Sequence, residues 1–286
     1  MANLLLSAAA WLARWLPESV KRGLYRIPVL SRFIRTSLNR AAPQGMTVVQ
    51  VAAGGLEGWQ LDLDLQAEKD YWLGTYETEL QAAAEELVQP GAVAYDVGAN
   101  IGYISLLLAR HVGPQGQVFA FEALPENLER LRRNIALNPG AQIVQVVAVA
   151  VVDNSGPVQF LVGSSGSIGK AKGSAGRDKI SYPDALLVSG VSLDQFVYQQ
   201  NNPEPQIIKM DIEGGEVLAL PGMVRLLQEA RPAILLELHG PEAARTAWTT
   251  LVGAGYQICR MQPGFPAVPS LESLDWKAYV VALPAI

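Results

Sequence analysis

The sequence predicts an α/β protein built on a mainly parallel β-sheet with helices on both faces. From Gly91 onward, short apolar runs alternate with amphipathic stretches, which is the pattern of strand-helix-strand units. The apolar runs are continuous, as in parallel strands that are buried on both faces. The 286 residues and the 50% hydrophobic content suffice for one large domain with a buried core.

Strands and helices are expected to follow one another through this region. Pro125 stands at the start of the predicted helix 125–138, and proline fits the first turn of a helix. The segment 163–185 breaks the alternation, because it is rich in Gly, Ser and Lys, and we expect a variable loop there. The predicted strands are residues 92–97, 117–122, 142–151, 206–212, 233–239, 256–261 and 277–283, and the predicted helices are residues 101–112, 125–138, a segment that ends near residue 229, and 241–253.

A basic N-terminal segment precedes the alternation. Residues 1–45 predict an amphipathic helical segment, since residues 1–40 contain seven Arg or Lys and a single acid, Glu18. Its apolar run, from Leu4 to Ala13, is shorter than the roughly 20 residues that span a bilayer. Such a helix is typical of contact with an anionic membrane surface, and the alternative is a helical lead-in that packs on the domain.

A hairpin and a helix connect this segment to the alternation. Residues 46–65 alternate apolar and polar positions around Gly54, where a glycine allows the positive φ of a turn, so we expect a β-hairpin. Residues 77–88 predict a helix, and the Pro-Gly pair at residues 90–91 ends it. We therefore expect a single domain over residues 46–286, with its core at residues 77–286.

Charge and cysteine content disfavour some classes of function. The net charge of −5 argues against nucleic acid as the main partner, because phosphate binding needs a basic surface. Cys259 is the only cysteine, so the chain forms no intrachain disulfide and no cysteine-rich zinc site. We expect a cytoplasmic protein with peripheral contact at the inner membrane face through residues 1–40. The sequence does not indicate an oligomeric state.

A glycine-rich turn follows the first strand of the predicted sheet. The strand ends at Asp96, and Gly98, Asn100 and Gly102 follow in the pattern D-x-G-x-N-x-G. Ligands of open parallel sheets bind outside the carboxyl ends of the strands. Glycines allow a ligand to contact the backbone, and the free N–H groups of the next helix suit a carboxylate. The dinucleotide pattern G-x-G-x-x-G is absent, and Asp96 would repel a pyrophosphate.

A second acid ends the next strand. Glu122 stands where a carboxylate can accept hydrogen bonds from both hydroxyls of a ribose. Its negative charge disfavours a phosphorylated ribose. The turn from Asp96 to Gly102 and Glu122 together therefore predict a site for a nucleoside without a pyrophosphate.

Four segments resemble one known family. DVGANIGYISLLLAR, VFAFEALPENLERLRRNIALN, IIKMDIEGGEVLALPGM and RPAILLELHG resemble the FkbM-type methyltransferases in sequence, order and spacing, from about Tyr71 to about Gly240. The resemblance implies a Rossmann-like class I methyltransferase fold, with a seven-stranded, mostly parallel sheet and one antiparallel edge strand. It also implies S-adenosylmethionine as cofactor and, as acceptor, a hydroxyl oxygen on a sugar, glycolipid or polyketide-like natural product.

The resemblance also implies which residues contact the cofactor. Residues 1–45, the loop 163–185 and the C-terminal end have no clear counterpart in the family, and we expect them to select the acceptor. The expected contacts are Asp96, Gly98, Asn100 and Gly102 for the methionine part, Glu122 for the ribose, Ala123, Leu124, Val147 and Ala148 for the adenine, and Glu77, in TYETE, as a cover from the N-terminal side.

Charged residues at the ends of the fourth and fifth strands are candidates for acid–base chemistry. An alcohol must lose a proton during methylation, and its pKa lies far above neutrality, so a base or a metal helps. Residues i and i+2 of a strand point the same way, so Lys209, Asp211 and, if the strand persists, Glu213 form one row. Glu237 and His239 form another. His239 is the best base by its pKa, Asp211 is a base or an orienting group, and Lys209 neutralises carboxylates.

Asp211, Glu237 and His239 are also a ligand set for a divalent cation, and the alternative is a charge-paired structural cluster. The expected activity is S-adenosylmethionine-dependent O-methylation of a small-molecule, sugar or lipid-linked acceptor. Two other functions stay open. A nucleotide-dependent oxidoreductase on the same sheet is disfavoured by the absent G-x-G-x-x-G. A catalytically silent, membrane-associated scaffold that only binds the cofactor is disfavoured by the intact charged rows.

Overall fold

The structure is a computed structural model that describes residues 9, 11–15, 36, 40–163, 169–176 and 181–285. The chain forms two compact units. The first contains the predicted hairpin, and the second contains the predicted sheet. Their bounds are Met1–Gln81 with Ala136–Asn138 for the first unit, and Ala82–Ile135 with Pro139–Ile286 for the second.

The first unit contains the predicted hairpin. Strands β1 (Met46–Gln50) and β2 (Gln60–Asp64) pair antiparallel, as the alternating pattern predicts. Residues 51–59 join them in a loop in which Gly54 has a φ of 78°. A short helix, α4 (Lys69–Leu73), follows β2.

The predicted N-terminal segment 1–45 lies mostly outside the described residues. Within it, residues 11–15 are helical. In the part of the chain that the structure describes, no helix is both long enough and apolar enough to cross a bilayer. The predicted helix at residues 77–88 is present as α5 (Thr78–Leu87).

The second unit contains the predicted seven-stranded sheet, in the order β12-β13-β11-β10-β3-β4-β5. Neighbouring strands are parallel from β5 to β11, whereas β13 runs antiparallel to both β11 and β12. The antiparallel strand therefore lies one position inside the edge and not at the edge. The strands are β3 (Val93–Val97), β4 (Gln117–Phe121), β5 (Val144–Val147), β10 (Ile207–Met210), β11 (Ala233–His239), β12 (Tyr256–Arg260) and β13 (Lys277–Pro284).

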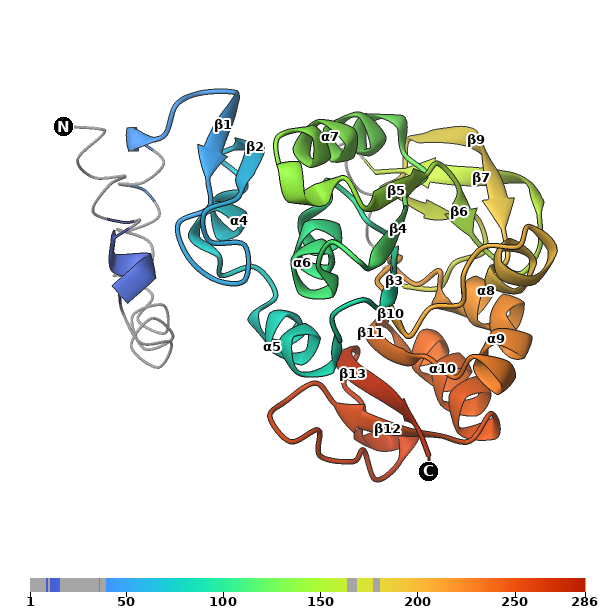
Figure 1. Cartoon of the computed structure of the whole chain (residues 1–286). Helices are drawn as coiled ribbons and strands as arrows, with labels where there is room; N and C mark the ends of the chain where they lie inside the picture. The colour runs from blue at the N-terminus through green and yellow to red at the C-terminus, as the bar shows by residue number, and fades with distance from the viewer. Residues whose placement is uncertain are drawn as a thin grey trace. The chain divides into compact units, whose positions relative to one another are not determined.

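Helices cover both faces of this sheet. Figure 1 shows α6 (Tyr103–Val112) and α7 (Pro125–Ala136) on one side and α8 (Glu216–Ala219), α9 (Val224–Glu229) and α10 (Pro241–Gly253) on the other. The helix predicted to end near residue 229 is interrupted by the 3₁₀ segment Leu220–Met223. Pro221 lies in this segment, and proline has no N–H for a continuous helical ladder.

A second, four-stranded sheet replaces part of the predicted loop. Its order is β6-β9-β7-β8. The predicted strand 142–151 is in fact two strands, because the chain leaves the main sheet after β5 and enters the second sheet three residues later. The predicted loop 163–185 contains β8 and the start of β9, while residues 164–168 and 177–180 lie outside the described part. The strands are β6 (Ala150–Val151), β7 (Gly156–Val162), β8 (Gly169–Ala171) and β9 (Asp184–Val191).

An aromatic cluster lies on one face of the main sheet. The ring of Phe196 lies 5.7 Å from the ring of Tyr95 on β3 and 4.9 Å from the ring of Phe121 on β4. Successive side chains of a strand point to opposite faces. Asp96 and Lys209 therefore point away from this aromatic cluster.

Packing at the centre of the sheet predicts a large loss of stability when a side chain is shortened. Leu236 on β11 is 0% exposed, so Leu236→Ala should lower the free energy of unfolding by about 2–5 kcal/mol, through lost burial and a cavity. Urea denaturation measures this change. Leu187→Ala on β9 is the matched control, because Leu187 is 77% exposed, and its unfolding midpoint should stay near that of the wild type. Equal losses in the two variants would contradict the assigned core.

Candidate functional site

The turn after β3 has the backbone that its glycines predict. Gly98, Asn100 and Gly102 all have positive φ angles, of 82°, 50° and 93°. A Cβ on Gly98 would lie 2.0 Å from the backbone oxygen of Asp211, and one on Gly102 would lie 2.5 Å from a methyl group of Leu131. The glycines are therefore needed both for backbone conformation and for close packing.

Asp96 is a buried anchor behind this turn. Its side chain is 0% exposed, and its Oδ2 accepts a hydrogen bond of 2.6 Å from Ser105 on α6. The ammonium of Lys209 lies 3.2 Å from Asp96 Oδ1 and donates a 2.8 Å hydrogen bond to the backbone oxygen of Gly98. Both oxygens of Asp96 thus have partners within the chain, and Asp96 fixes the position at which the turn begins.

Glu122 joins the end of β4 to the same turn. Its Oε2 accepts a 2.8 Å hydrogen bond from the backbone N–H of Asn100, and its Oε1 accepts bonds of 2.8 Å from the N–H groups of Ala123 and Leu124. Burial raises the pKa of the Glu122 carboxyl, and these bonds together with one from the Asn127 side chain oppose that rise. The carboxylate is therefore held in one orientation by its surroundings.

The other predicted cofactor residues lie at two places. Ala123 and Leu124 are buried beside Glu122, whereas Ala148 is exposed just after β5. The backbone oxygen of Val147 accepts a 3.1 Å hydrogen bond from the N–H of Glu122, so this strand end adjoins the Glu122 strand end. Glu77 belongs to the first compact unit, and its role as a cover over the cofactor stays a prediction.

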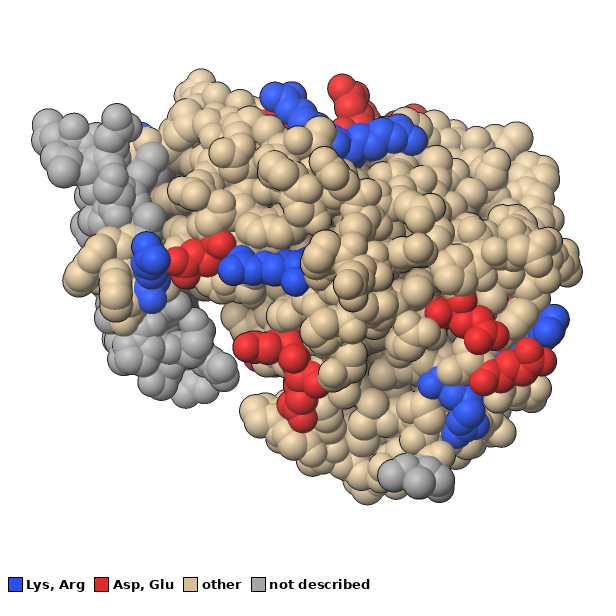
Figure 2. Space-filling model, in the orientation of Figure 1, with Lys and Arg blue, Asp and Glu red and all other residues tan. Residues whose placement is uncertain are grey.

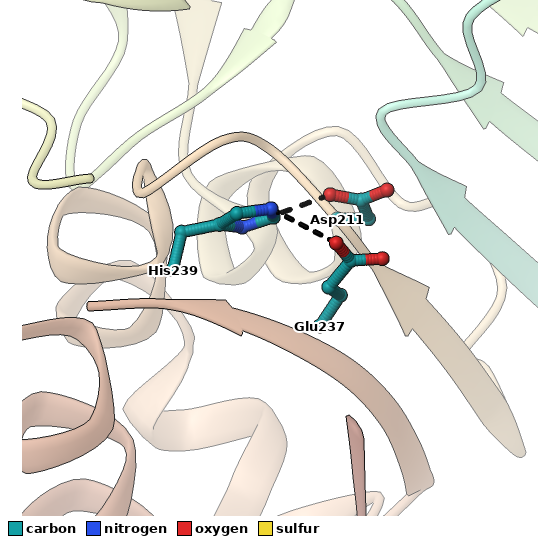
Figure 3. A group of neighbouring side chains, drawn as sticks. All are labelled: Asp211, Glu237 and His239. Carbon is teal, nitrogen blue, oxygen red and sulfur yellow. Dashed lines mark ion pairs between the residues drawn. The ribbon is translucent and has the colours of Figure 1, made fainter. Parts of the chain in front are cut away.

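A second group of charged side chains surrounds His239 at the ends of β10 and β11. Figure 3 shows the imidazole of His239 directed toward the carboxylates of Asp211 and Glu237. His239 Nε2 lies 2.9 Å from Glu237 Oε1 and 3.7 Å from Glu213 Oε2. On the other side of the ring, Nδ1 lies 3.9 Å from Asp211 Oδ1 and 4.0 Å from Glu216 Oε1. Four carboxylates therefore surround one imidazole.

Burial and charge shift the pKa values of this group in opposite directions. Burial lowers the pKa of His239, but the hydrogen bond to Glu237 and the nearby charges of Asp211 and Glu213 outweigh it, so the net shift is upward. Burial raises the pKa of Glu237, but the bonds from His239 and Lys277 outweigh it, so the net shift is downward. Burial also raises the pKa of Glu216, to about 7.

The two predicted rows of charged side chains had different outcomes. Glu237 and His239 do lie side by side on β11, as their i and i+2 spacing predicts. The other row does not form, because β10 ends at Met210 and Glu213 adopts a φ of 54° in the following loop. Lys209 therefore contacts Asp96 at the cofactor turn, whereas Asp211 turns toward His239.

The sequence did not reveal three charged or polar residues that contact the predicted site residues. Lys277 forms an ion pair with Glu237, because β13 pairs antiparallel with β11 in a register that places Lys277 opposite His239. No local pattern reveals a partner so distant in sequence. Glu216 and Ser105 had a weak signal, since each is a polar residue in the first turn of its helix, next to apolar residues.

Part of the predicted variable loop contacts the loop that carries Asp211. The N–H of Ala175 donates a 2.9 Å hydrogen bond to the backbone oxygen of Gly214. A Cβ on Gly214 would lie 2.2 Å from the oxygen of Ala175, so the two segments are in direct contact. Lys170 is buried and donates a 2.9 Å hydrogen bond to the same oxygen of Ala175. This segment therefore lies next to the His239 group.

Several characterised proteins are similar to this chain in sequence. "Hexuronic acid methyltransferase AglP" of Haloferax volcanii is 29% identical over 147 residues, which are 51% of this chain and 56% of that protein. "Protein-L-isoaspartate O-methyltransferase" of Aeropyrum pernix is 46% identical over 59 residues, or 21% and 23% of the two chains. "Methyltransferase sdnD" of Sordaria araneosa is 25% identical over 191 residues, or 58% and 73%. The chain thus spans about half the length of AglP.

Solved structures also resemble it, at low sequence identity. The methyltransferase FkbM from Methylobacillus flagellatus has a TM-score of 0.43 and 18% identity, over 76% of this chain and 53% of that chain. A precorrin-6y C5,15-methyltransferase from Geobacter metallireducens has a TM-score of 0.44 and 16% identity, over 73% and 90%.

A family profile described as "Methyltransferase FkbM domain" matches residues 96–263. The matched range is more than half of the chain. It begins at Asp96 and includes the glycine-rich turn, Glu122 and the carboxylates around His239. The resemblance seen in the sequence motifs is confirmed, and the chain belongs to the FkbM methyltransferase family.

Proposed function

We propose that this protein is an S-adenosylmethionine-dependent methyltransferase that methylates a hydroxyl oxygen. The observation that carries the proposal is the connection between the glycine-rich turn and Glu122, made by the 2.8 Å hydrogen bond from Asn100 N–H to Glu122 Oε2. This bond joins two neighbouring strand ends at the side of the sheet where open parallel sheets bind ligands, which supports a nucleoside site there. Membership of a methyltransferase family supports the same cofactor.

The residues present fit this cofactor. Asn100 Oδ1 is buried and has no hydrogen-bond partner among the described residues, so it is free to accept a bond from the amino group of the methionine part. Glu122 would accept hydrogen bonds from the ribose hydroxyls. These bonds would replace the hydrogen bond that the Asn127 side chain donates to Glu122. Ala123, Leu124 and Ala148 would flank the adenine, as the family resemblance implies. When bound, the cofactor supplies an already activated methyl group, so the protein mainly aligns the reactants.

The group around His239 is the proposed site of acceptor activation. The side chains of Asp211 and Glu213 are 19% and 29% exposed, whereas that of His239 is 1% exposed. An acceptor hydroxyl would therefore meet the two carboxylates first, with His239 and Glu237 behind them. This group would accept the hydroxyl proton, and a divalent cation held by Asp211, Glu237 and His239 would lower the pKa of the hydroxyl.

The proposed acceptor is a sugar or another hydroxylated small molecule, free or lipid-linked. The name of AglP gives a hexuronic acid as the substrate of that protein, which supports a sugar acceptor here. On the face that Figure 2 displays, Lys and Arg are interspersed with Asp and Glu, which does not suit a polyanionic partner. We expect the Ala175 segment to contribute to acceptor selection, because it contacts Gly214 next to the His239 group.

The cofactor assignment predicts binding that depends on Glu122. Calorimetry should show micromolar-range binding of S-adenosylhomocysteine, an affinity on the scale of ordinary enzyme substrates. Glu122→Gln should weaken it about tenfold or more, because a hydrogen bond to a charged group contributes about 1.5–3 kcal/mol. Glu126→Gln, a change of the same kind on the exposed first turn of α7, is the control and should bind like the wild type. No detectable binding by the wild type would refute the assignment.

The activation site predicts a loss of turnover without a loss of cofactor affinity. His239→Ala and Asp211→Asn should each lower methyl transfer by about a hundredfold, the usual size of a general-base contribution. Transfer of a labelled methyl group to a panel of hexuronic acids and other sugars measures turnover, and calorimetry measures cofactor affinity. Glu242→Gln, an exposed position on α10, is the control. Cofactor binding by a wild type that methylates no acceptor would favour the silent scaffold instead.

The basic N-terminal segment predicts peripheral membrane contact, which its sequence alone supports. Seven basic residues and an apolar run in residues 1–40 should bind anionic vesicles. Deletion of residues 1–40 should reduce co-flotation with vesicles of phosphatidylserine and phosphatidylcholine. Pure phosphatidylcholine vesicles serve as the control. Equal flotation of the deleted and full-length chains would exclude this contact.

A further inference from the structure

Three side chains near His239 offer ligand atoms that lie close enough together to be candidates for one ion. One oxygen each from Asp211 and Glu237 and one ring nitrogen of His239 lie within 4.8 Å of one another (Figure 3). Ligand atoms at roughly 2.0–2.2 Å from a common ion are at most about 4 Å apart. Glu237 lies beside Nε2 and Asp211 beside Nδ1, so the three groups would share one ion once the imidazole or the Glu237 carboxylate has turned.

A second observation points to an absent ligand at the same place. His239 is 1% exposed, and its Nδ1 has no hydrogen-bond partner among the described residues. This nitrogen faces Asp211 Oδ1 at 3.9 Å and Glu216 Oε1 at 4.0 Å, which is too far for hydrogen bonds. Glu216 is 0% exposed, and its Oε2 also lacks a hydrogen-bond partner. Buried polar atoms normally have partners, and a cation between these groups would be one.

The charged groups around His239 include more carboxylates than cations. Four carboxylates lie within 4.0 Å of the imidazole of His239, and the ion pairs described here join this cluster to one lysine, Lys277, with His239 itself positive when protonated. Carboxylates therefore outnumber cationic groups among the described residues of this cluster, although burial leaves Glu216 only partly ionised near neutral pH. Buried charges are normally paired or bound to metal, so this excess favours a divalent cation.

We propose that Asp211, Glu237 and His239 bind a divalent transition-metal ion such as Mn²⁺ or Zn²⁺. Imidazole nitrogen suits zinc and its neighbours, while carboxylates suit manganese and magnesium, so a mixed set favours Mn²⁺ or Zn²⁺ over Mg²⁺. Lys277 forms an ion pair with Glu237, so its ammonium group would compete with the metal ion for the Glu237 carboxylate. The site itself is independent of the proposed function.

The use of the ion rests on the proposed function. The backbone oxygen of Asp211 would lie 2.0 Å from a Cβ on Gly98, so the metal ligands adjoin the proposed cofactor turn. An ion at this position would bind the acceptor hydroxyl next to the transferable methyl group and lower its pKa. In the proposed O-methylation, metal binding would therefore be the means by which the hydroxyl is activated.

Electron paramagnetic resonance of Mn²⁺ titrated into the full chain, without cofactor, tests the site. Saturable binding of one Mn²⁺ per chain is expected. His239→Ala and Asp211→Asn should weaken it at least tenfold, since even changes around metal ligands cost about 10–100-fold in affinity. Lys277→Met should strengthen it, because the competing ammonium is gone. Glu242→Gln removes an exposed carboxylate on α10 and should change nothing.

Three outcomes would overturn the proposal. They are the absence of saturable Mn²⁺ binding by the wild type, unchanged affinity in a correctly folded His239→Ala variant, and equal displacement of Mn²⁺ by Mg²⁺ and Zn²⁺. Circular dichroism melting checks the fold of each variant, and Glu237→Gln offers a conservative substitute if His239→Ala does not fold. Mn²⁺ binding without S-adenosylhomocysteine binding would contradict the proposed methyltransferase and leave the cation site standing.

Discussion

The buried ion pair of Asp96 and Lys209 is the contact on which the rest of the site depends. The two residues lie opposite each other on the adjacent parallel strands β3 and β10. Both are nearly excluded from solvent, so removal of either partner would leave an uncompensated charge in the protein interior, at a cost of about 3–5 kcal/mol. Lys209 also donates to the backbone oxygen of Gly98, and this bond places the start of the glycine-rich turn.

From this pair, the site extends along the strand ends in both directions. Toward β4, the N–H of Asn100 donates a hydrogen bond to Glu122 and so positions the carboxylate that is proposed to bind the cofactor ribose. Toward β11, the loop after β10 brings Asp211 to His239, which is held by Glu237. The absence of a side chain on Gly98 lets the two parts meet. Four neighbouring strands therefore contribute to one site at their carboxyl ends, where open parallel sheets bind ligands.

The sequence predicted the features that depend on local pattern. Continuous apolar runs indicated the main sheet, the glycine spacing indicated the turn after β3, and the i and i+2 spacing of Glu237 and His239 indicated their proximity. Features that depend on where a strand ends were not predictable in the same way. Lys209 and Asp211 have the same spacing as Glu237 and His239, yet β10 ends between them and separates their side chains.

Features that depend on long-range pairing were also beyond the sequence. Lys277 reaches Glu237 only because of the antiparallel register of β13. The continuous apolar run at residues 142–151 hides the point at which the chain leaves one sheet for another, since both strands are apolar. The short strand β8 lies within a Gly- and Ser-rich segment whose composition indicates a loop, and its pairing with β7 is what makes it a strand.

The two parts of the site differ in how their charge is balanced, and this difference bears on methyl transfer. Backbone N–H groups solvate Glu122, whereas the carboxylates around His239 outnumber their positive partners. A sulfonium cofactor loses its positive charge as the methyl group leaves, so excess negative charge nearby would stabilise the reactant more than the transition state. Neutralisation of this excess, by a proton or by a bound cation, removes that penalty. In the proposed O-methylation, the change that activates the acceptor hydroxyl would then also favour transfer of the methyl group from sulfur.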